Sequence, residues 1–294
     1  MPYKVQNNKI FIEAVEINVT NRCNLSCRGC SHLSPLCKSD EFDTNQLEYA
    51  INKLSTVCHF DTVRLLGGEP FLSKSLRDII KITKNSGVSD KVIIVSNGLL
   101  LNEEHAEILE QVDKLRISAH TNNLDIEKIK KLTHKRCDLE IMFFDLFRES
   151  YSEQGTKDVE LITSISDTCM IGHVWSCYNL EQGVFYKCPQ AHCFKPYFKD
   201  LKSDGIDIVR SNCLEHDIKS YIDDKTPLSA CKYCLGSVGK LFAQKQINRR
   251  DWRKKQDYLT EQMIDYDFLE KLKVKKDSNF GCVLKTIYIG KNER

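Results

Sequence analysis

Continuous apolar runs alternate with amphipathic segments along the first half of the chain. A strand with one face in water would show polar residues at every second position, so unbroken apolar runs predict strands covered on both faces, as in a parallel sheet. The predicted strands are Ile10–Val19, Thr62–Leu66, Lys91–Val95, Leu115–Ser118 and Leu139–Phe144.

The segments between these runs have the spacing of amphipathic helices. In the first of them apolar residues recur every three or four positions, at Leu47, Ala50, Ile51, Leu54, Val57 and Cys58. Asp43, with Gln46 three residues later, predicts the N-terminus of this helix. Further helices are expected over 76–84, 103–112 and 126–133. Repeated strand–helix units imply right-handed crossovers, and therefore an α/β fold with a parallel barrel or an open sheet.

The strand–helix rhythm ends near residue 150, and a cysteine-rich stretch follows. Its seven cysteines are Cys169, Cys177, Cys188, Cys193, Cys213, Cys231 and Cys234. After residue 240 the chain turns basic and predicts a helix with a solvated charged face, and Val283–Ile289 predicts a last strand. The expected divisions of the chain are 1–150, 151–240 and 241–294.

Composition narrows the class of protein further. The 294 residues carry a net charge of +2, which gives no reason to expect a nucleic-acid partner. Neither a secretory segment at the N-terminus nor an apolar run long enough to span a membrane is present. With 14 cysteines and no secretory signal, metal binding or catalysis is expected rather than disulfides, in a reducing, cytosolic compartment.

Three cysteines follow directly after the first predicted strand, at Cys23, Cys27 and Cys30. Three thiolates can hold three irons of a [4Fe–4S] cube and leave the fourth iron open to a small molecule. A zinc site is the alternative, but zinc prefers four ligands, usually in two C-x2-C pairs, and no partner pair lies nearby in the sequence.

Glycine and polar residues follow the next strands in the same way. They form the turns Gly67-Gly68-Glu69-Pro70, Ser96-Asn97-Gly98 and Ser118-Ala119-His120. The carboxyl ends of parallel strands meet at one edge of a sheet, so these turns and the cysteine triplet are expected to form one site. Asn-Gly is also a routine turn sequence, which is the alternative explanation for the second of them.

The triplet and the Gly-Gly-Glu-Pro turn together resemble the radical S-adenosylmethionine (SAM) superfamily. The resemblance implies a partial (β/α)6 parallel barrel in which the open iron chelates SAM. One electron then cleaves SAM to methionine and a 5′-deoxyadenosyl radical, which takes hydrogen from a substrate. The SAM-binding residues implied are Gly67, Gly68, Glu69, Pro70, Asn97 and Ser118. The family usually has an aromatic residue just before its third cysteine, whereas this chain has Gly29.

The later cysteines form a second pattern around a predicted hairpin. Tyr178–Tyr186, with a turn at Gly183, is followed by Cys188, and a C-x2-C pair comes later at Cys231 and Cys234. This arrangement resembles the twitch and SPASM modules of radical SAM enzymes, which implies a small cysteine-rich, twitch-like extension with an auxiliary [4Fe–4S] cluster. Either Cys169 or Cys177 would be the fourth ligand, with Cys169 preferred. A zinc knuckle from the same residues is the alternative.

The expected function is that of a radical SAM enzyme acting on a small polar substrate. The loop from Cys23 to Pro35 resembles radical SAM proteins associated with bacterial polysaccharide and aminoglycoside sugars, which implies a sugar or nucleotide-sugar that is epimerised or dehydrogenated. An epimerase needs a thiol hydrogen donor, for which Cys193 and Cys213 are the candidates, whereas a dehydrogenase needs an electron acceptor. An electron donor such as flavodoxin or ferredoxin is implied as a partner.

Two other functions fit the same sequence. One is a peptide-modifying radical SAM maturase. The other is an iron–sulfur or zinc protein that binds a partner without cleaving SAM. An assay for 5′-deoxyadenosine separates this last class from the enzymes.

Overall fold

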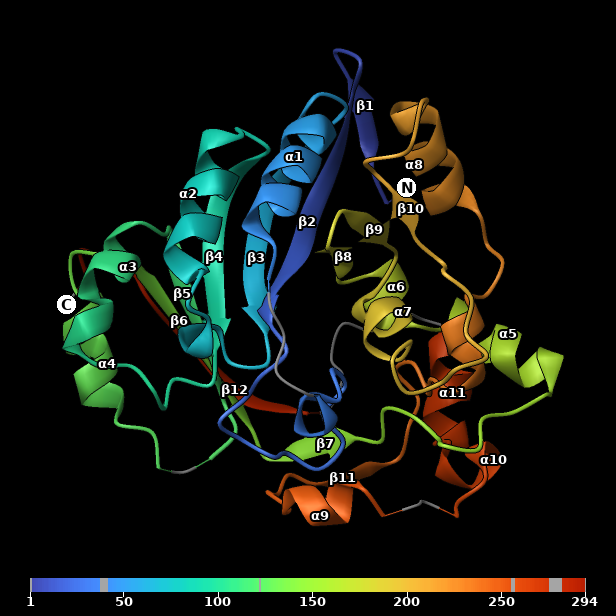
Figure 1. Cartoon of the computed structure of the whole chain (residues 1–294). Helices are drawn as coiled ribbons and strands as arrows, with labels where there is room; N and C mark the ends of the chain where they lie inside the picture. Colours follow the sequence, from blue (N-terminus) through green and yellow to red (C-terminus); the bar gives the residue numbers. More distant parts are fainter. Residues whose placement is uncertain (1, 38–41, 122, 255–256, 275–281, 294) are drawn as a thin grey trace.

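A single large sheet dominates the structure, a computed structural model that describes residues 2–37, 42–121, 123–254, 257–274 and 282–293. Its ten strands are β1 (Lys4–Gln6), β2 (Lys9–Thr20), β3 (Cys58–Gly67), β4 (Ser89–Ser96), β5 (Lys114–Ala119), β6 (Asp138–Phe144), β8 (Tyr178–Glu181), β9 (Val184–Tyr186), β10 (Ile206–Asp207) and β12 (Val283–Ile289). They are arranged in the order β10-β9-β8-β2-β3-β4-β5-β6-β12, and β1 pairs with β2 (Figure 1). A separate two-stranded sheet joins β7 (Leu146–Arg148) to β11 (Leu241–Ala243).

The strands β2 to β6 run parallel in sequence order, which confirms the predicted α/β fold with a mostly parallel sheet. A sixth parallel strand, β8, lies beside β2 rather than after β6. On the other side β12 pairs antiparallel with β6 and forms the last strand of the sheet. The two edges of the parallel core are therefore both covered by segments from beyond residue 150.

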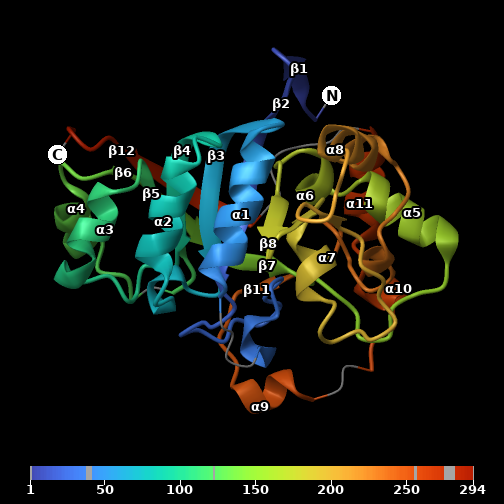
Figure 2. The same cartoon turned by 45° about the horizontal axis from the view of Figure 1, so that its top comes forward.

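Four helices cover the outer face of β2–β6, as Figures 1 and 2 show from two directions. They are α1 (Thr44–Ser55), α2 (Leu76–Asn85), α3 (Ala106–Glu110) and α4 (Ile126–Thr133). Asp43 begins α1, because its carboxylate accepts the backbone N–H of Asn45 and of Gln46. The Gln46 side chain bonds the backbone carbonyl of Gln182 instead of completing a capping box.

The predicted first helix was too long at its C-terminal end. Helix α1 ends at Ser55, and Cys58 begins the strand β3. Cys58 is fully buried in the main core, so its apolar character, which fitted the helical spacing, serves the sheet instead.

The two faces of the parallel sheet differ in polarity. Outward-facing residues such as Ile17, Leu65 and Ile117 pack under the helices in the main hydrophobic core. The inner face instead carries charge, including Glu16 on β2 beside Arg64 on β3. The expectation of strands that are apolar on both faces was therefore wrong, since the inner face lines a cavity rather than a second apolar layer.

Most of the chain after residue 150 forms a second region beside β8, seen on the right in Figures 1 and 2, with α9 at the bottom of both views. Its helices are α5 (Val159–Asp167), α6 (Met170–His173), α7 (Pro189–Cys193), α8 (Leu214–Asp223), α9 (Arg249–Trp252), α10 (Thr260–Met263) and α11 (Tyr266–Val274). Short 3-10 helices occur at η1 (Ser34–Leu36), η2 (Pro70–Leu72), η3 (Glu103–His105) and η4 (Ser229–Lys232). The predicted hairpin is confirmed as β8 and β9, with Gln182 and Gly183 in the left-handed conformation.

The basic segment after residue 240 is mostly extended rather than helical. Up to Lys254 it begins as β11, continues as a chain that pairs with the cysteine loop and forms the four-residue α9. The helices α10 and α11 and the predicted last strand, β12, follow. Among the described residues, none of the helices has the length and apolar character needed to cross a membrane.

Candidate functional site

The first three cysteines lie on a loop that leaves the carboxyl end of β2. Cys27 is buried and Cys23 and Cys30 are partly exposed. Two backbone bonds hold the start of this loop against the turn after β3, from Gly68 N–H to the Thr20 carbonyl at 2.7 Å and from Glu69 N–H to the Arg22 carbonyl at 2.8 Å. The structure therefore brings the cysteine loop and the Gly67–Pro70 turn together, as expected from their positions at strand ends.

Both glycines of this turn are required by close backbone approach. A Cβ atom on Gly67 would lie 2.1 Å from the Thr20 carbonyl oxygen, and one on Gly68 would lie 2.0 Å from the Arg22 carbonyl oxygen. Gly67 also has a φ of 137°, which side chains rarely adopt. The pair of glycines thus fixes where the cysteine loop begins.

Glu69 is fully buried and ties the turn to the end of β4. Its carboxylate accepts the Ser96 hydroxyl at 2.7 Å and the Asn97 backbone N–H at 2.9 Å. Burial raises the pKa of this carboxyl, while the bonds from Asn97 and Ser96 lower it. Glu69 is therefore a structural link between two of the predicted site turns in this structure.

Asn97 carries the connection on to the cysteine loop. Its side-chain amide donates to Asn24 Oδ1 at 2.8 Å and lies 4.0 Å from the sulfur of Cys23. Its own side-chain oxygen accepts the N–H of Leu99 at 3.0 Å, which fixes the orientation of the amide. The ends of β2, β3 and β4 therefore form one bonded unit around Cys23.

A segment that the sequence did not single out crosses the other side of the loop. Gln246 forms an antiparallel bridge with Cys27, and its side-chain amide donates to the Cys27 sulfur at 3.0 Å. The same side chain accepts the Ser26 N–H at 2.7 Å, and Arg249 donates to the Cys23 carbonyl at 3.1 Å. We call residues 244–249 the strap, because they hold the cysteine loop through both backbone and side chains.

Gly29 leaves room for an aromatic ring that comes from β11. A Cβ atom at position 29 would lie 2.7 Å from Cζ of Phe242, so a larger residue at 29 and this ring exclude each other. The Arg28 guanidinium lies over the same ring, 4.2 Å from its centre, and pairs with Glu149. The Phe242 ring therefore fills the space that a side chain at position 29 would enter.

Four of the later cysteines lie close to one another in the second region. Burial raises the pKa of the Cys234 thiol well above its usual range, and the nearby thiols of Cys169, Cys231 and Cys188 add to the rise. They come from four places in the fold: the N-terminus of α6, the N-terminus of α7, η4 and the turn after η4.

Cys177 lies apart from most of this group, against the inner face of the sheet. Its thiol neighbours the Glu16 carboxyl, and the Arg64 guanidinium approaches its sulfur at 3.9 Å. Burial raises the pKa of the Cys177 thiol, and the carboxylate of Glu16 raises it further. The charge of Cys169, one of the four grouped cysteines, raises it as well.

A cavity of about 610 Å³ separates the inner face of the sheet from the second region. Gly29 and Ser31 of the cysteine loop, Ser118 at the end of β5, and both Cys177 and Cys234 line it. Charged side chains of the strands also face it: Glu16, Arg64, Arg116 and Glu140. Arg116 pairs with Glu140 at 3.0 Å, so the charged residues form ion pairs across neighbouring strands.

The two thiols predicted as hydrogen donors do not line this cavity. Cys213 is exposed at the N-cap of α8 and borders a separate pocket with Val57 and His216. Cys193 is buried in a small core with Leu33 and Tyr151. A thiol on the outer surface cannot deliver hydrogen into the cavity, so the structure gives no support to Cys213 in this role.

Comparison with known proteins identifies the first region. The sequence profile of the Radical SAM superfamily matches residues 17–150. Residues 17–150 belong to the radical SAM superfamily. This radical SAM domain contains the end of β2, the cysteine loop, the Gly67–Pro70 turn and the strands β3 to β6.

Curated relatives match the same part of the chain. A probable GTP 3′,8-cyclase of Methanocaldococcus jannaschii is 32% identical over 122 residues, which cover 42% of this chain and 40% of that protein. A GTP 3′,8-cyclase of Aquifex aeolicus is 30% identical over 142 residues, covering 47% and 43%. The chain therefore spans only about two fifths of the length of these relatives.

Solved structures of radical SAM proteins match over more of the chain at lower identity. BtrN in complex with AdoMet and 2-DOIA is 17% identical, covers 77% of this chain and 94% of its own, and has a TM-score of 0.45. Native anSMEcpe with bound AdoMet is 14% identical, with 88% and 95% covered and a TM-score of 0.47.

The donor set in the radical SAM domain fits an iron–sulfur cluster. Among the described residues, no three Cys, His, Asp or Glu side chains are grouped so that they could hold one metal ion. A cluster places one thiolate on each iron instead. Burial raises the pKa of the Cys23 thiol to about 12, and the charges of Cys30 and Cys27 oppose its ionisation further. Such thiols become thiolates only with a cationic partner, which the irons supply.

Proposed function

We propose that the protein cleaves SAM reductively and that the resulting radical takes hydrogen from a small polar substrate held in the cavity. The observation that carries this proposal is the position of the cysteine loop. Its stem is bonded to the Gly67–Glu69 turn and to Asn97, and its residues Gly29 and Ser31 form part of the cavity wall.

Each group at this site has a separate task in the proposal. Cys23, Cys27 and Cys30 would hold the first [4Fe–4S] cluster, which when bound supplies the electron for cleavage of the S–C bond. The turn at Gly67–Pro70 offers backbone groups beside the loop, because neither glycine has a side chain to block them. Asn97 and Ser118 flank the same edge and would orient SAM, with Glu69 holding Asn97 in place.

Phe242 would provide the aromatic contact that Gly29 lacks. Its ring occupies the space next to Gly29, and Arg28 stacks on the ring. Aromatic rings favour offset stacking with planar groups such as the adenine of SAM. A residue from β11 would in this way compensate for the departure from the usual family pattern in the cysteine loop.

The cysteines of the second region would hold an auxiliary cluster. Cys169, Cys188, Cys231 and Cys234 are the four whose thiols lie together, and they fit a cube with one thiolate per iron. Cys177 would then be left without an iron, in agreement with its separate position beside Glu16 and Arg64. Because Cys234 also lines the cavity, the auxiliary cluster would lie next to the substrate.

The substrate would be a sugar or nucleotide-sugar. A cavity of about 610 Å³ falls within the size range of small-molecule sites. Paired charges on its wall, Arg64 with Glu16 and Arg116 with Glu140, suit a ligand rich in hydroxyl and phosphate groups. The curated relatives are named for GTP, which is also a small polar molecule of this kind.

Dehydrogenation and epimerisation place different demands on this site. In a dehydrogenation the substrate radical would lose one further electron and a proton, and a cluster held by the auxiliary cysteines would accept that electron, so no thiol is needed. An epimerase needs a hydrogen donor that faces the substrate. Of the cysteines outside both ligand sets, Cys177 and Cys282 line the cavity, whereas the earlier candidates Cys193 and Cys213 do not.

The test is 5′-deoxyadenosine release by anaerobically reconstituted protein with dithionite. We expect release to rise above background with nucleotide-sugars or aminoglycoside-type sugars. Turnover in D2O then distinguishes the reactions, because an epimerase puts one deuterium on the product carbon and a dehydrogenase gives a product two hydrogens poorer. Release provoked only by peptides would favour a peptide maturase, and no release at all would leave an iron–sulfur binding protein.

A further inference from the structure

The proposed cleavage needs one electron for each SAM molecule, and the electron must reach the first cluster from outside. The cysteine loop itself is accessible from one side, where Arg22 and Asn24 are exposed. The strap and α9 lie on this same side, at the bottom of Figure 1.

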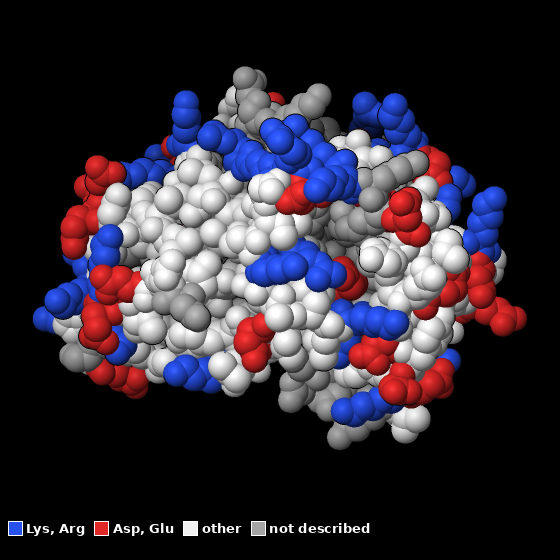
Figure 3. Space-filling view, turned by 90° about the horizontal axis from the view of Figure 1, so that it is seen from below, with Lys and Arg blue, Asp and Glu red and all other residues white. Residues whose placement is uncertain are grey.

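This side of the molecule carries a concentration of positive charge. Between residues 245 and 254 there are five basic residues and one acidic residue, Asp251, which pairs with Lys254 at 2.6 Å. The exposed basic side chains are Arg22, Lys245, Arg249, Arg250 and Arg253, and within the described part of the chain no carboxylate forms an ion pair with them. Figure 3 shows this face with a band of Lys and Arg side chains across it.

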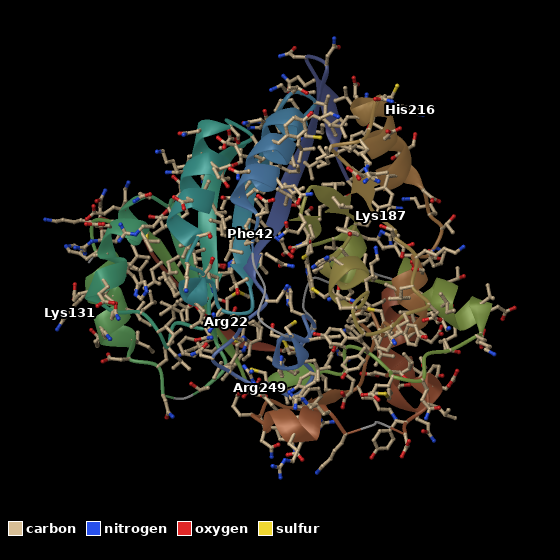
Figure 4. The ribbon with its side chains drawn as sticks, in the orientation of Figure 1. Arg22, Phe42, Lys131, Lys187, His216 and Arg249 are labelled. Carbon is tan, nitrogen blue, oxygen red and sulfur yellow. The ribbon has the colours of Figure 1, made fainter. Side chains whose placement is uncertain are left out.

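Packing and hydrogen bonds fix the backbone that carries these basic side chains close to the cysteine loop. Trp252 of α9 is buried, and its ring stacks on Tyr151 with the ring planes 12° apart. Arg249 donates to the Cys23 carbonyl, and Figure 4 shows Arg22 and Arg249 on the same side of the molecule. Basic side chains from the cysteine loop, the strap and α9 therefore surround the accessible side of the first cluster site.

We propose that this basic surface docks an acidic one-electron carrier protein, of the flavodoxin type, that reduces the first cluster. The inference rests on the proposed SAM cleavage. Complementary charge raises the association rate of such partners and orients them, and electron-transfer complexes manage with small, weak interfaces. Docking here would bring the carrier against the strap, whose Gln246 contacts the Cys27 sulfur directly.

The test compares two electron sources in charge-reversed variants. R250E/R253E changes Arg250 of α9 and Arg253 at its C-cap, both exposed. K128E/K131E makes the same change on α4, at the far edge of the molecule, where Figure 4 labels Lys131. With limiting reduced flavodoxin at low salt, we expect R250E/R253E to form 5′-deoxyadenosine at least about tenfold more slowly than wild type. K128E/K131E should stay within about twofold, and dithionite should support all three proteins equally.

Several outcomes would overturn the proposal. One is a flavodoxin-driven rate in R250E/R253E that equals wild type, and another is a wild-type rate that does not fall with salt. If R250E/R253E also loses its dithionite activity, the docking surface is tested with the neutral variant R250Q/R253Q instead. It should show a smaller decrease, about threefold, and a weaker salt dependence, and equality with wild type would refute the docking surface.

A second measurement separates this proposal from the proposed function. The rate at which flavodoxin bleaches the iron–sulfur absorbance reports docking even if SAM is never cleaved, so absence of 5′-deoxyadenosine alone would leave the docking result standing. Binding of a short single-stranded RNA that R250E/R253E abolishes, with unchanged cluster reduction, would assign the surface to nucleic acid and contradict the proposal.

Discussion

The two cysteine sets of this protein are built in opposite ways. The radical SAM domain draws Cys23, Cys27 and Cys30 from one short loop, and it fixes that loop through bonds from the ends of β3 and β4. The second region draws Cys169, Cys188, Cys231 and Cys234 from four separate places in the fold. The first set is positioned by a large sheet, whereas the second depends on the packing of short helices.

The hydrophobic cores that support the two cysteine sets differ in size. The main core runs under the whole parallel sheet and its covering helices. The second region has two small clusters, one around Leu235 and Met170 and one around Phe194 and Trp252. Small cores contribute less stabilisation, so bound metal should matter more to the fold of the second region than to that of the first.

The largest expected effect comes from removing the first set. In a C23A/C27A/C30A variant we expect complete loss of SAM cleavage and loss of about half of the roughly eight irons of a two-cluster protein. Iron analysis and the 5′-deoxyadenosine assay measure these. The domain should keep its fold, because the large core does not depend on the loop. Retained cleavage would refute the assignment of these cysteines.

Removal of one ligand of the second set should affect the auxiliary cluster and leave the first cluster in place. C188A or C231A should lose the auxiliary cluster but keep part of the SAM cleavage with dithionite, because the ligands lie in different regions. We also expect the melting temperature to fall by several degrees in these variants, and more than in the triple variant. Loss of zinc with unchanged iron would instead identify a zinc site.

The comparison of Cys169 with Cys177 tests the membership of the second set. C169A should lose the auxiliary cluster, whereas C177A should retain it, because Cys169 neighbours the other three thiols and Cys177 lies beside Glu16 and Arg64. Electron paramagnetic resonance of the reduced proteins provides the measurement. The reverse pattern would make Cys177 the ligand and place the auxiliary cluster nearer the inner face of the sheet.

Substitution of Phe242 should weaken the contact that β11 makes with the first site. We expect F242A to raise the KM for SAM about tenfold, roughly 1.4 kcal/mol, with a smaller change in kcat. F242Y keeps the ring and is the matched control. Equal KM values for F242A and wild type would show that the ring only packs against Gly29 and Arg28.

The smallest effect is expected from a substitution in the strap, on the reduction potential of the first cluster. Q246L removes the hydrogen bond to the Cys27 sulfur, and a net loss of about 1 kcal/mol would lower the potential of the first cluster by roughly 40 mV. The direction follows because the donor stabilises the more negative, reduced cluster. Potentiometry measures it, with the exposed Q111L as control. An unchanged potential would show that the bond to sulfur has no electronic effect.

Much of the radical SAM domain could be predicted from its sequence. The five parallel strands, the helices between them and the turns at their ends are all local patterns of apolar and turn residues, and they are confirmed within a few residues. The hairpin around Gly183 was predictable for the same reason, because its left-handed turn needs glycine.

The missed features depend on contacts between distant segments. The alternate charged residues Glu16, Arg64 and Arg116 sit among apolar neighbours, so the strands looked apolar throughout until the sheet placed these residues on one face. The local sequence predicts a basic helix across the strap, whose extended shape comes instead from bonds to residues more than 200 positions away. Nothing in the local sequence showed that Cys213 would lie on the outer surface.

Strand β2 belongs to both regions at once. It leads directly into the cysteine loop, and Glu16 and Ile17 on it pair with Asn179 and Leu180 of β8, the strand that leads through β9 to Cys188. Separation of the two regions would require breaking this ladder in the middle of the sheet. The chain should therefore unfold in one cooperative transition rather than domain by domain, and the second region should not fold when it is expressed alone.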